Sequence, residues 1–134
     1  MNYRYVPALL YMALIFYISS ILLPKPIEQV TTFYFDPGKH LAHLVEYAIL
    51  SALLYVALRN VNKSFIVSAF YGLSDEVHQY FVPTRFFDLT DLTFDVLGAL
   101  LGALFTALLC KKVAERREAS KLSARPQQRV FLRE

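Results

Sequence analysis

Four long blocks of mostly apolar residues run along the chain, separated by short segments that carry proline and charged residues. The blocks are Val6–Leu23, His40–Leu58, Ser64–Phe81 and Asp91–Cys110. Each holds about 18 to 20 residues, roughly the length that a helix needs to cross the hydrocarbon core of a bilayer. The pattern therefore predicts an all-α fold, an integral membrane bundle of four transmembrane helices over residues 1–110, followed by a basic tail over residues 111–134.

The composition supports a membrane protein, because 56% of the 134 residues are hydrophobic and only 19% are charged, which is unusual for a soluble domain. The first block carries little that is polar beyond Ser19 and Ser20, so we interpret it as a plain anchor. A cleaved signal peptide is the alternative, but the apolar run is long and no A-x-A-like site follows it. The single cysteine, Cys110, excludes a disulfide within the chain, and we expect it to be a small buried apolar residue.

The distribution of Lys and Arg predicts the orientation, since cytoplasmic flanks of membrane helices are enriched in them. The tail from Lys111 to Glu134 holds eight basic residues and three acids. We therefore expect the tail, the N-terminus and the Arg59–Lys63 turn to lie in the cytoplasm of a cell membrane protein. Segments Pro24–Lys39 and Val82–Thr90 then lie outside.

The tail itself has two interpretations: a determinant of this topology, or a contact for anionic lipid headgroups. A nucleic-acid partner is not expected. Without the tail, six basic and eight acidic residues remain, so the acidic excess belongs to the predicted membrane body.

These eight acids all fall in the outer loops or the outer halves of the predicted helices. They are Glu28, Asp36, Glu46, Asp75, Glu76, Asp88, Asp91 and Asp95. An ionisable side chain inside a membrane segment costs on the order of 2.5–3.5 kcal/mol, so these groups should face each other or water rather than lipid.

Helical spacing places the polar residues of each helix on one face, because residues three, four and seven apart lie on the same side. The aligned sets are Lys39, His43, Glu46, Tyr47 and Leu50; Gly72, Asp75, Glu76, Gln79 and Pro83; and Asp91, Asp95, Gly98 and Gly102. His40 and His78 lie off these stripes and could face headgroups or the bundle. The two glycines suit a close helix contact.

These residues resemble the VanZ-like membrane proteins. The resemblance covers roughly residues 36–102 and rests on His43-x-x-Glu46-Tyr47, on Asp75-Glu76-x-x-Gln79-x-Phe81-x-Pro83-x-Arg85, and on Asp91, Gly98 and Gly102. Asp95 stands where that family more often has Asn, and Thr84 where Gly is common. The resemblance implies a bacterial-type envelope protein, similar to one that lowers sensitivity to the glycopeptide antibiotic teicoplanin. It implies no settled reaction.

The residues themselves support an enzyme acting on a lipid-linked or wall-associated substrate near the outer leaflet. The expected catalytic residues are Asp75, Glu76, His43 and Asp91, and the expected substrate-binding residues are Arg85, Gln79, Glu46, Tyr47 and Lys39. A divalent cation is a possible cofactor, with Asp75, Glu76, Asp91, Asp95 and His43 as candidate ligands. Without such an ion, one carboxylate could act with His43 as a general acid or base. No Ser or Cys nucleophile with a neighbouring base is evident in the stripes, which favours phosphoryl or proton chemistry over acyl transfer.

Three alternatives remain. The protein could bind envelope components without chemistry, or it could be a proton-coupled transporter or flippase component, alone or as a homo-oligomer. The polar groups could also serve only to lock the bundle through ion pairs such as Asp75–Arg85 and Glu46–Lys39.

The sequence makes one sharp geometric prediction. His43, Glu46, Asp75, Glu76, Gln79, Arg85 and Asp91 should form one connected cluster that opens to the outer face. Arg85 should fold back over its mouth and contact Asp75, Glu76 or Asp91.

Overall fold

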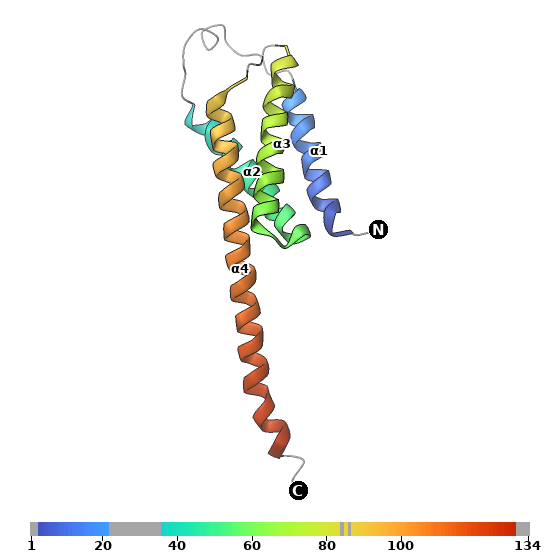
Figure 1. Cartoon of the computed structure of the whole chain (residues 1–134), viewed down its shortest axis with the longest axis vertical. Helices are drawn as coiled ribbons and strands as arrows, with labels where there is room; N and C mark the ends of the chain where they lie inside the picture. The colour runs from blue at the N-terminus through green and yellow to red at the C-terminus, as the bar shows by residue number, and fades with distance from the viewer. Residues whose placement is uncertain (1–2, 22–35, 84, 86, 131–134) are drawn as a thin grey trace.

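A computed structural model describes residues 3–21, 36–83, 85 and 87–130, with side chains described up to residue 123 (Figure 1). This part of the chain forms helices α1 (Val6–Ser20, after a short 3-10 turn at Tyr3–Tyr5), α2 (Pro37–Leu58), α3 (Val61–Phe81) and α4 (Leu89–Val130). It contains no strand, so the predicted all-α class is confirmed. The predicted outer-loop residues 24–35, including Glu28, and Thr84 lie outside the described residues.

Local capping sets the ends of α2 and the start of α3. The Asp36 carboxylate accepts hydrogen bonds from the backbone N–H groups of Gly38 and Lys39, at 3.0 and 3.3 Å, and Pro37 occupies the first helical position. α2 ends where Arg59 takes a left-handed conformation with φ of 54°. Asn60 then caps α3 by accepting from the Lys63 backbone N–H at 2.9 Å. This tight turn makes α2 and α3 antiparallel.

The first and last helices differ from the predicted blocks. α1 ends at Ser20, and Ile21 is already extended, whereas the block was expected to continue to Leu23. α4 continues to Val130, far past Cys110, where the apolar block ends. The sequence after Cys110 is rich in Ala, Lys, Glu and Arg, which are strong helix formers, so loss of hydrophobicity does not end the helix. The predicted tail is therefore mostly an extension of α4.

By length and composition, two helices are able to cross a membrane: α2, and α4 over Leu89–Ser123. α1 has only 15 residues, and α3 includes Lys63, Asp75 and Glu76. The four-span bundle is therefore not confirmed. Large apolar side chains nevertheless cover the outside of the bundle on all four helices, including Leu9, Val45, Phe70 and Phe105. Such a surface suits contact with lipid.

The closest helix contact joins α2 and α4, where Gly98 and Gly102 face the backbone of Leu44 and Ala48. A Cβ atom at Gly98 would lie 2.9 Å from the carbonyl carbon of Leu44, closer than real Cβ contacts allow. The glycines thus let the two backbones approach, as small residues do at helix interfaces in membranes. α1 packs on the bundle through Ala8 and Ile15.

The chain runs back and forth through the bundle. The start of α1, the α2–α3 turn and the projecting end of α4 lie towards one side, while the end of α3 and the start of α4 lie towards the other (Figure 1). Successive helices therefore alternate in direction through the bundle.

Candidate functional site

Buried polar side chains gather towards the end of the bundle where α2 and α4 begin and α3 ends. Six ionisable or amide side chains there are no more than 4% exposed: His40, Asp75, Glu76, Gln79, Asp91 and Asp95. A bundle with apolar outer faces and charges inside is the arrangement that a low-dielectric surrounding favours. The polar faces predicted from helical spacing therefore point inward.

One group of contacts joins the first turns of α2 to the first turns of α4, and Asp91 lies at its centre. The Asp91 carboxylate forms an ion pair with Lys39, and His40 Nδ1 lies 3.0 Å from Asp91 Oδ1, within hydrogen-bond distance. One turn deeper, His43 Nδ1 lies 2.9 Å from Asp95 Oδ1, and His43 Nε2 lies 3.7 Å from Asp91 Oδ2. The spacing of Lys39 and His43 matches that of Asp91 and Asp95, four residues in each helix, so the pairs stack along the α2–α4 contact.

Asp88 lies just before α4 and connects this group of contacts to α3. It also forms part of the solvent-exposed edge of the group. Its backbone N–H donates to Glu76 Oε2 at 2.9 Å, and its carboxylate lies 3.2 Å from Lys39 Nζ. Partial burial works to raise the pKa of the Asp88 carboxyl, but the Thr90 backbone N–H and the Lys39 ammonium outweigh it and lower the pKa below its usual value. Lys39 and Asp88 are about one-third exposed, so they form the rim of the site.

A second group of contacts joins α1 to α3 around Asp75. Ser19 Oγ donates to Asp75 Oδ1 at 2.5 Å, and Gln79 Nε2 donates to Asp75 Oδ2 at 2.8 Å. Arg85 then donates to Gln79 Oε1 at 3.1 Å. Both oxygens of the buried Asp75 carboxylate are therefore satisfied.

A serine and a histidine also meet beside this second group, since Ser20 Oγ lies 3.0 Å from His78 Nε2. The single hydroxyl proton of Ser20 is directed to the Phe16 carbonyl at 2.6 Å, so the contact with His78 is satisfied when Nε2–H donates. A histidine that donates to a hydroxyl does not act as its base. This pair is therefore not arranged as an activated nucleophile.

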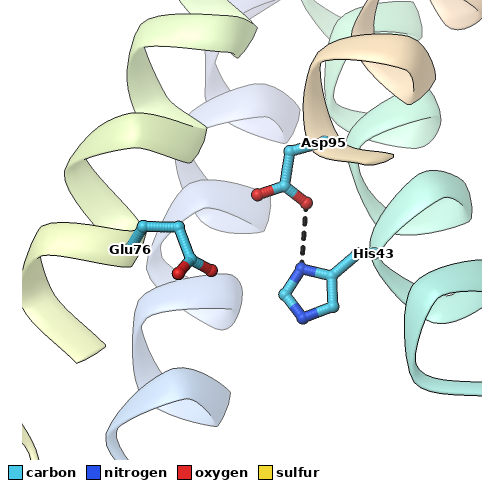
Figure 2. Close-up of side chains that lie close together, drawn as sticks. All are labelled: His43, Glu76 and Asp95. Atoms are coloured by element: carbon cyan, nitrogen blue, oxygen red, sulfur yellow. Dashed lines mark hydrogen bonds and ion pairs between the residues drawn. The ribbon is translucent and has the colours of Figure 1, made fainter. Parts of the chain in front are cut away.

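His43, Glu76 and Asp95 meet within the first group of contacts, and we call them the central triad (Figure 2). They come from α2, α3 and α4, and one potential ligand atom from each lies within 4.8 Å of the others. Glu76 and Asp95 are 0% exposed, and the oxygens Glu76 Oε1 and Asp95 Oδ2 have no hydrogen-bond partner among the described residues. Three of the five predicted cation ligands thus come together; Asp91 lies beside His43, and Asp75 belongs to the second group.

Several expected contacts are not formed. The expected contact of Arg85 with Asp75, Glu76 or Asp91 is wrong: among the described contacts Arg85 reaches Gln79 instead, because Gln79 stands between it and Asp75. The prediction of a single connected cluster is also wrong, because the contacts divide into two hydrogen-bonded groups. The possible structural pairs Asp75–Arg85 and Glu46–Lys39 are also absent from the part of the chain that the structure describes, where Lys39 binds Asp88 and Asp91 instead.

Two predicted residues of α2 have no hydrogen bond in either group. Glu46 is half-buried and forms no described hydrogen bond. Tyr47 is 0% exposed, and its hydroxyl has no partner within the described ranges. Its ring instead packs near Gly72, where an added Cβ would lie 3.2 Å from Tyr47 Cε1. Tyr47 therefore contributes to packing in this arrangement.

Sequence reasoning missed Ser19, His40 and Asp88. Ser19 was assigned to a plain anchor, yet its hydroxyl binds Asp75, so α1 takes part in the polar interior. His40 was placed off the stripe, yet it is 3% exposed, binds Asp91 and stacks on Phe94 with ring centroids 5.0 Å apart. Its position three residues before His43 could have revealed it, because such residues share a face.

The fold and site define a helical protein with lipid-compatible outer faces and a charged interior. A family model described as VanZ/LLP1 matches residues 8–110, which cover α1 from Ala8 onward, all of α2 and α3, and α4 up to Cys110. The chain belongs to this family. Comparison with curated proteins and with solved structures gave no match.

Proposed function

We propose that this protein is a multi-pass membrane protein, with four spans and both termini in the cytoplasm, that acts on a lipid-linked or wall-associated envelope component at the outer leaflet. The VanZ/LLP1 family is linked to glycopeptide resistance, which supports an envelope component as the target. The proposed consequence for the cell is lower sensitivity to teicoplanin.

The observation that carries this proposal is the excess of buried carboxylates over buried cations. Asp75, Glu76, Asp91 and Asp95 are each at most 4% exposed, whereas Lys39 is the only lysine or arginine that forms an ion pair with any of them among the described residues. A network that served stability alone would be neutralised, since an uncompensated buried charge is costly. Buried carboxylates gathered in one place are instead characteristic of functional sites.

The contacts favour certain kinds of chemistry. Arg85 lies partly exposed near the end of α3, and a guanidinium group can bind a phosphate or carboxylate group through its N–H donors. Asp75 positions Gln79, which in turn orients Arg85. The central triad offers carboxylate and imidazole groups for proton transfer. We therefore favour phosphoryl or proton chemistry over acyl transfer.

The test is teicoplanin susceptibility in a sensitive Gram-positive host that expresses the wild-type protein, Asp75→Asn or Glu115→Gln. Asn keeps the shape of Asp75 and is less costly to bury, so the variant should insert into the membrane but lose protection. Glu115 is exposed on the extension of α4 and provides the matched control. The proposal fails if the wild-type protein gives no protection, or if Asp75→Asn, present at the same membrane level, protects as well as the wild type.

The same strains distinguish an enzyme from a binding protein. Mass spectrometry of envelope lipids should show a species that changes with the wild-type protein and returns to the level of the empty strain with Asp75→Asn. Protection with an unchanged lipid profile would instead identify a protein that binds its target without chemistry.

A further inference from the structure

We infer that the central triad of His43, Glu76 and Asp95 binds one divalent cation of the Mn²⁺ or Zn²⁺ class between α2, α3 and α4. The inference deepens the proposed function and rests on it for its biological meaning. Cation binding is nevertheless measured without any substrate.

The first support is that two buried carboxylate oxygens have no partner. Glu76 and Asp95 are fully buried, yet Glu76 Oε1 and Asp95 Oδ2 accept no hydrogen bond from the described residues. Figure 2 shows the two carboxylates and the His43 ring directed towards the same space. Buried acceptors normally have a donor or an ion, so this pair is unusual unless a cation joins them.

The second support is that the remaining atoms of the triad are already held. Glu76 Oε2 accepts the Asp88 backbone N–H at 2.9 Å, and Asp95 Oδ1 lies 2.9 Å from His43 Nδ1. The Asp88 contact comes from outside the triad, and outer contacts of this kind fix the orientation of a metal ligand and leave its other oxygen available. The His43–Asp95 contact instead holds two of the proposed ligands side by side. Asp75 provides the contrast, because Ser19 and Gln79 satisfy both of its oxygens.

The third support is distance. The ligand atoms lie within 4.8 Å of one another, whereas two ligands that bind one ion with bonds of about 2.0–2.2 Å are separated by at most roughly 4.4 Å. The difference is a few tenths of an ångström, which small side-chain rotations remove. No movement of a helix is needed.

The donor set selects the class of cation. Two carboxylates and one imidazole combine hard oxygens with a borderline nitrogen, which suits Mn²⁺ and Zn²⁺ better than Ca²⁺, which takes six to eight oxygens. Three protein ligands leave coordination positions for water or for a phosphate oxygen. The rim at Lys39 and Asp88, whose side chains are about one-third exposed, lies on the path between the triad and the outside.

Binding can be measured on the full chain, purified in detergent and stripped with a chelator. Mn²⁺ is titrated and free Mn²⁺ is followed by electron paramagnetic resonance, with Zn²⁺ as a competitor. The wild type should bind one Mn²⁺ per chain, displaced by Zn²⁺. Glu76→Gln and Asp95→Asn keep the side-chain shape and should weaken binding by at least about 10–100-fold, the loss seen even for outer-contact mutations at metal sites.

Asp75→Asn is the matched control, since it removes a buried carboxylate from the same helix without touching the triad. It should retain Mn²⁺ affinity although it abolishes protection against teicoplanin, so the cation site and the proposed function fail separately. Circular dichroism confirms that each variant is folded, and His43→Gln provides a third variant if one carboxylate variant is not. The inference is overturned if the wild type shows no saturable binding, or if folded triad variants bind Mn²⁺ as the wild type does.

Discussion

The contact between α2 and α4 gives the most exacting test of the structure, through the substitution Gly98→Ala. The new Cβ would lie 2.9 Å from the carbonyl carbon of Leu44 and closer still to its oxygen, where ordinary contacts begin at 3.4 Å. These neighbours are backbone atoms of a helix, which cannot rotate away as a side chain does. The two helices must therefore separate by about half an ångström or more.

Overpacking of this kind costs about 1–3 kcal/mol, while replacing Gly by Ala within a helix returns up to about 1 kcal/mol. Because backbone on both sides limits relaxation, we expect an overpacking cost in the upper part of that range. The free energy of unfolding should therefore fall by about 1–2 kcal/mol in total. Gly102→Ala should lose more, since its Cβ would lie 2.7 Å from both the carbonyl carbon and the Cα of Ala48.

The free energy of unfolding can be measured by titrating the detergent-solubilised protein with sodium dodecyl sulfate. Two other glycines serve as controls. Gly72→Ala would meet only side-chain atoms, at 3.1–3.3 Å, and should have an intermediate effect; Gly38→Ala would meet only Asp36 Oδ1 at 3.3 Å and should change stability by less than about 0.5 kcal/mol. If Gly98→Ala is as stable as Gly38→Ala, the close α2–α4 contact is wrong.

Three further predictions follow from the site and the topology. With Cys110→Ala as background, a cysteine at Ser120 should be protected from a membrane-impermeant reagent added outside, and one at Thr84 should react; the reverse pattern would refute the orientation. Ser19→Ala removes the hydroxyl donor to Asp75 and should destabilise the protein by about 1–3 kcal/mol in the same unfolding assay, whereas Ser123→Ala, exposed on α4, should not. Folding lowers the pKa of Asp88. Its contribution to the free energy of unfolding is therefore present above the usual carboxyl pKa and is lost as the pH falls through the lowered value. The difference in stability between the wild type and Asp88→Asn should accordingly vanish in acid.

Helical spacing was enough to predict that the polar stripes of α2, α3 and α4 face inward, although it left out the buried His40. His43 and Asp95 meet because each lies on the polar stripe of its helix. In an apolar surrounding, charged stripes face one another because exposing them to that surrounding is costly. These features depend on periodicity and burial, which the sequence displays directly.

The remaining contacts depend on information that periodicity does not contain. The partner of Arg85 depends on the path of the chain after α3 and on the reach of Gln79, so the sequence could not show that an amide would separate Arg85 from Asp75. The role of Ser19 depends on which face of α3 meets α1. The end of α4 depends on helix propensity rather than on hydrophobicity, and the apolar block therefore predicted it too early.

The extension of α4 beyond the bundle has a mechanical consequence (Figure 1). From Cys110 to Val130 the helix rises about 30 Å, so its basic residues are carried on a rod rather than on a loose tether. If this rod continues away from the bilayer, Lys111 and Lys112 remain beside the headgroups. Lys121 lies roughly 16 Å further along the helix than Cys110. This distance is about two Debye lengths at physiological salt, so the charge of Lys121 is largely screened from the headgroups. The charges at the start of the extension then act on the membrane. A partner that binds Lys121 would find it at a fixed distance and direction from the bundle.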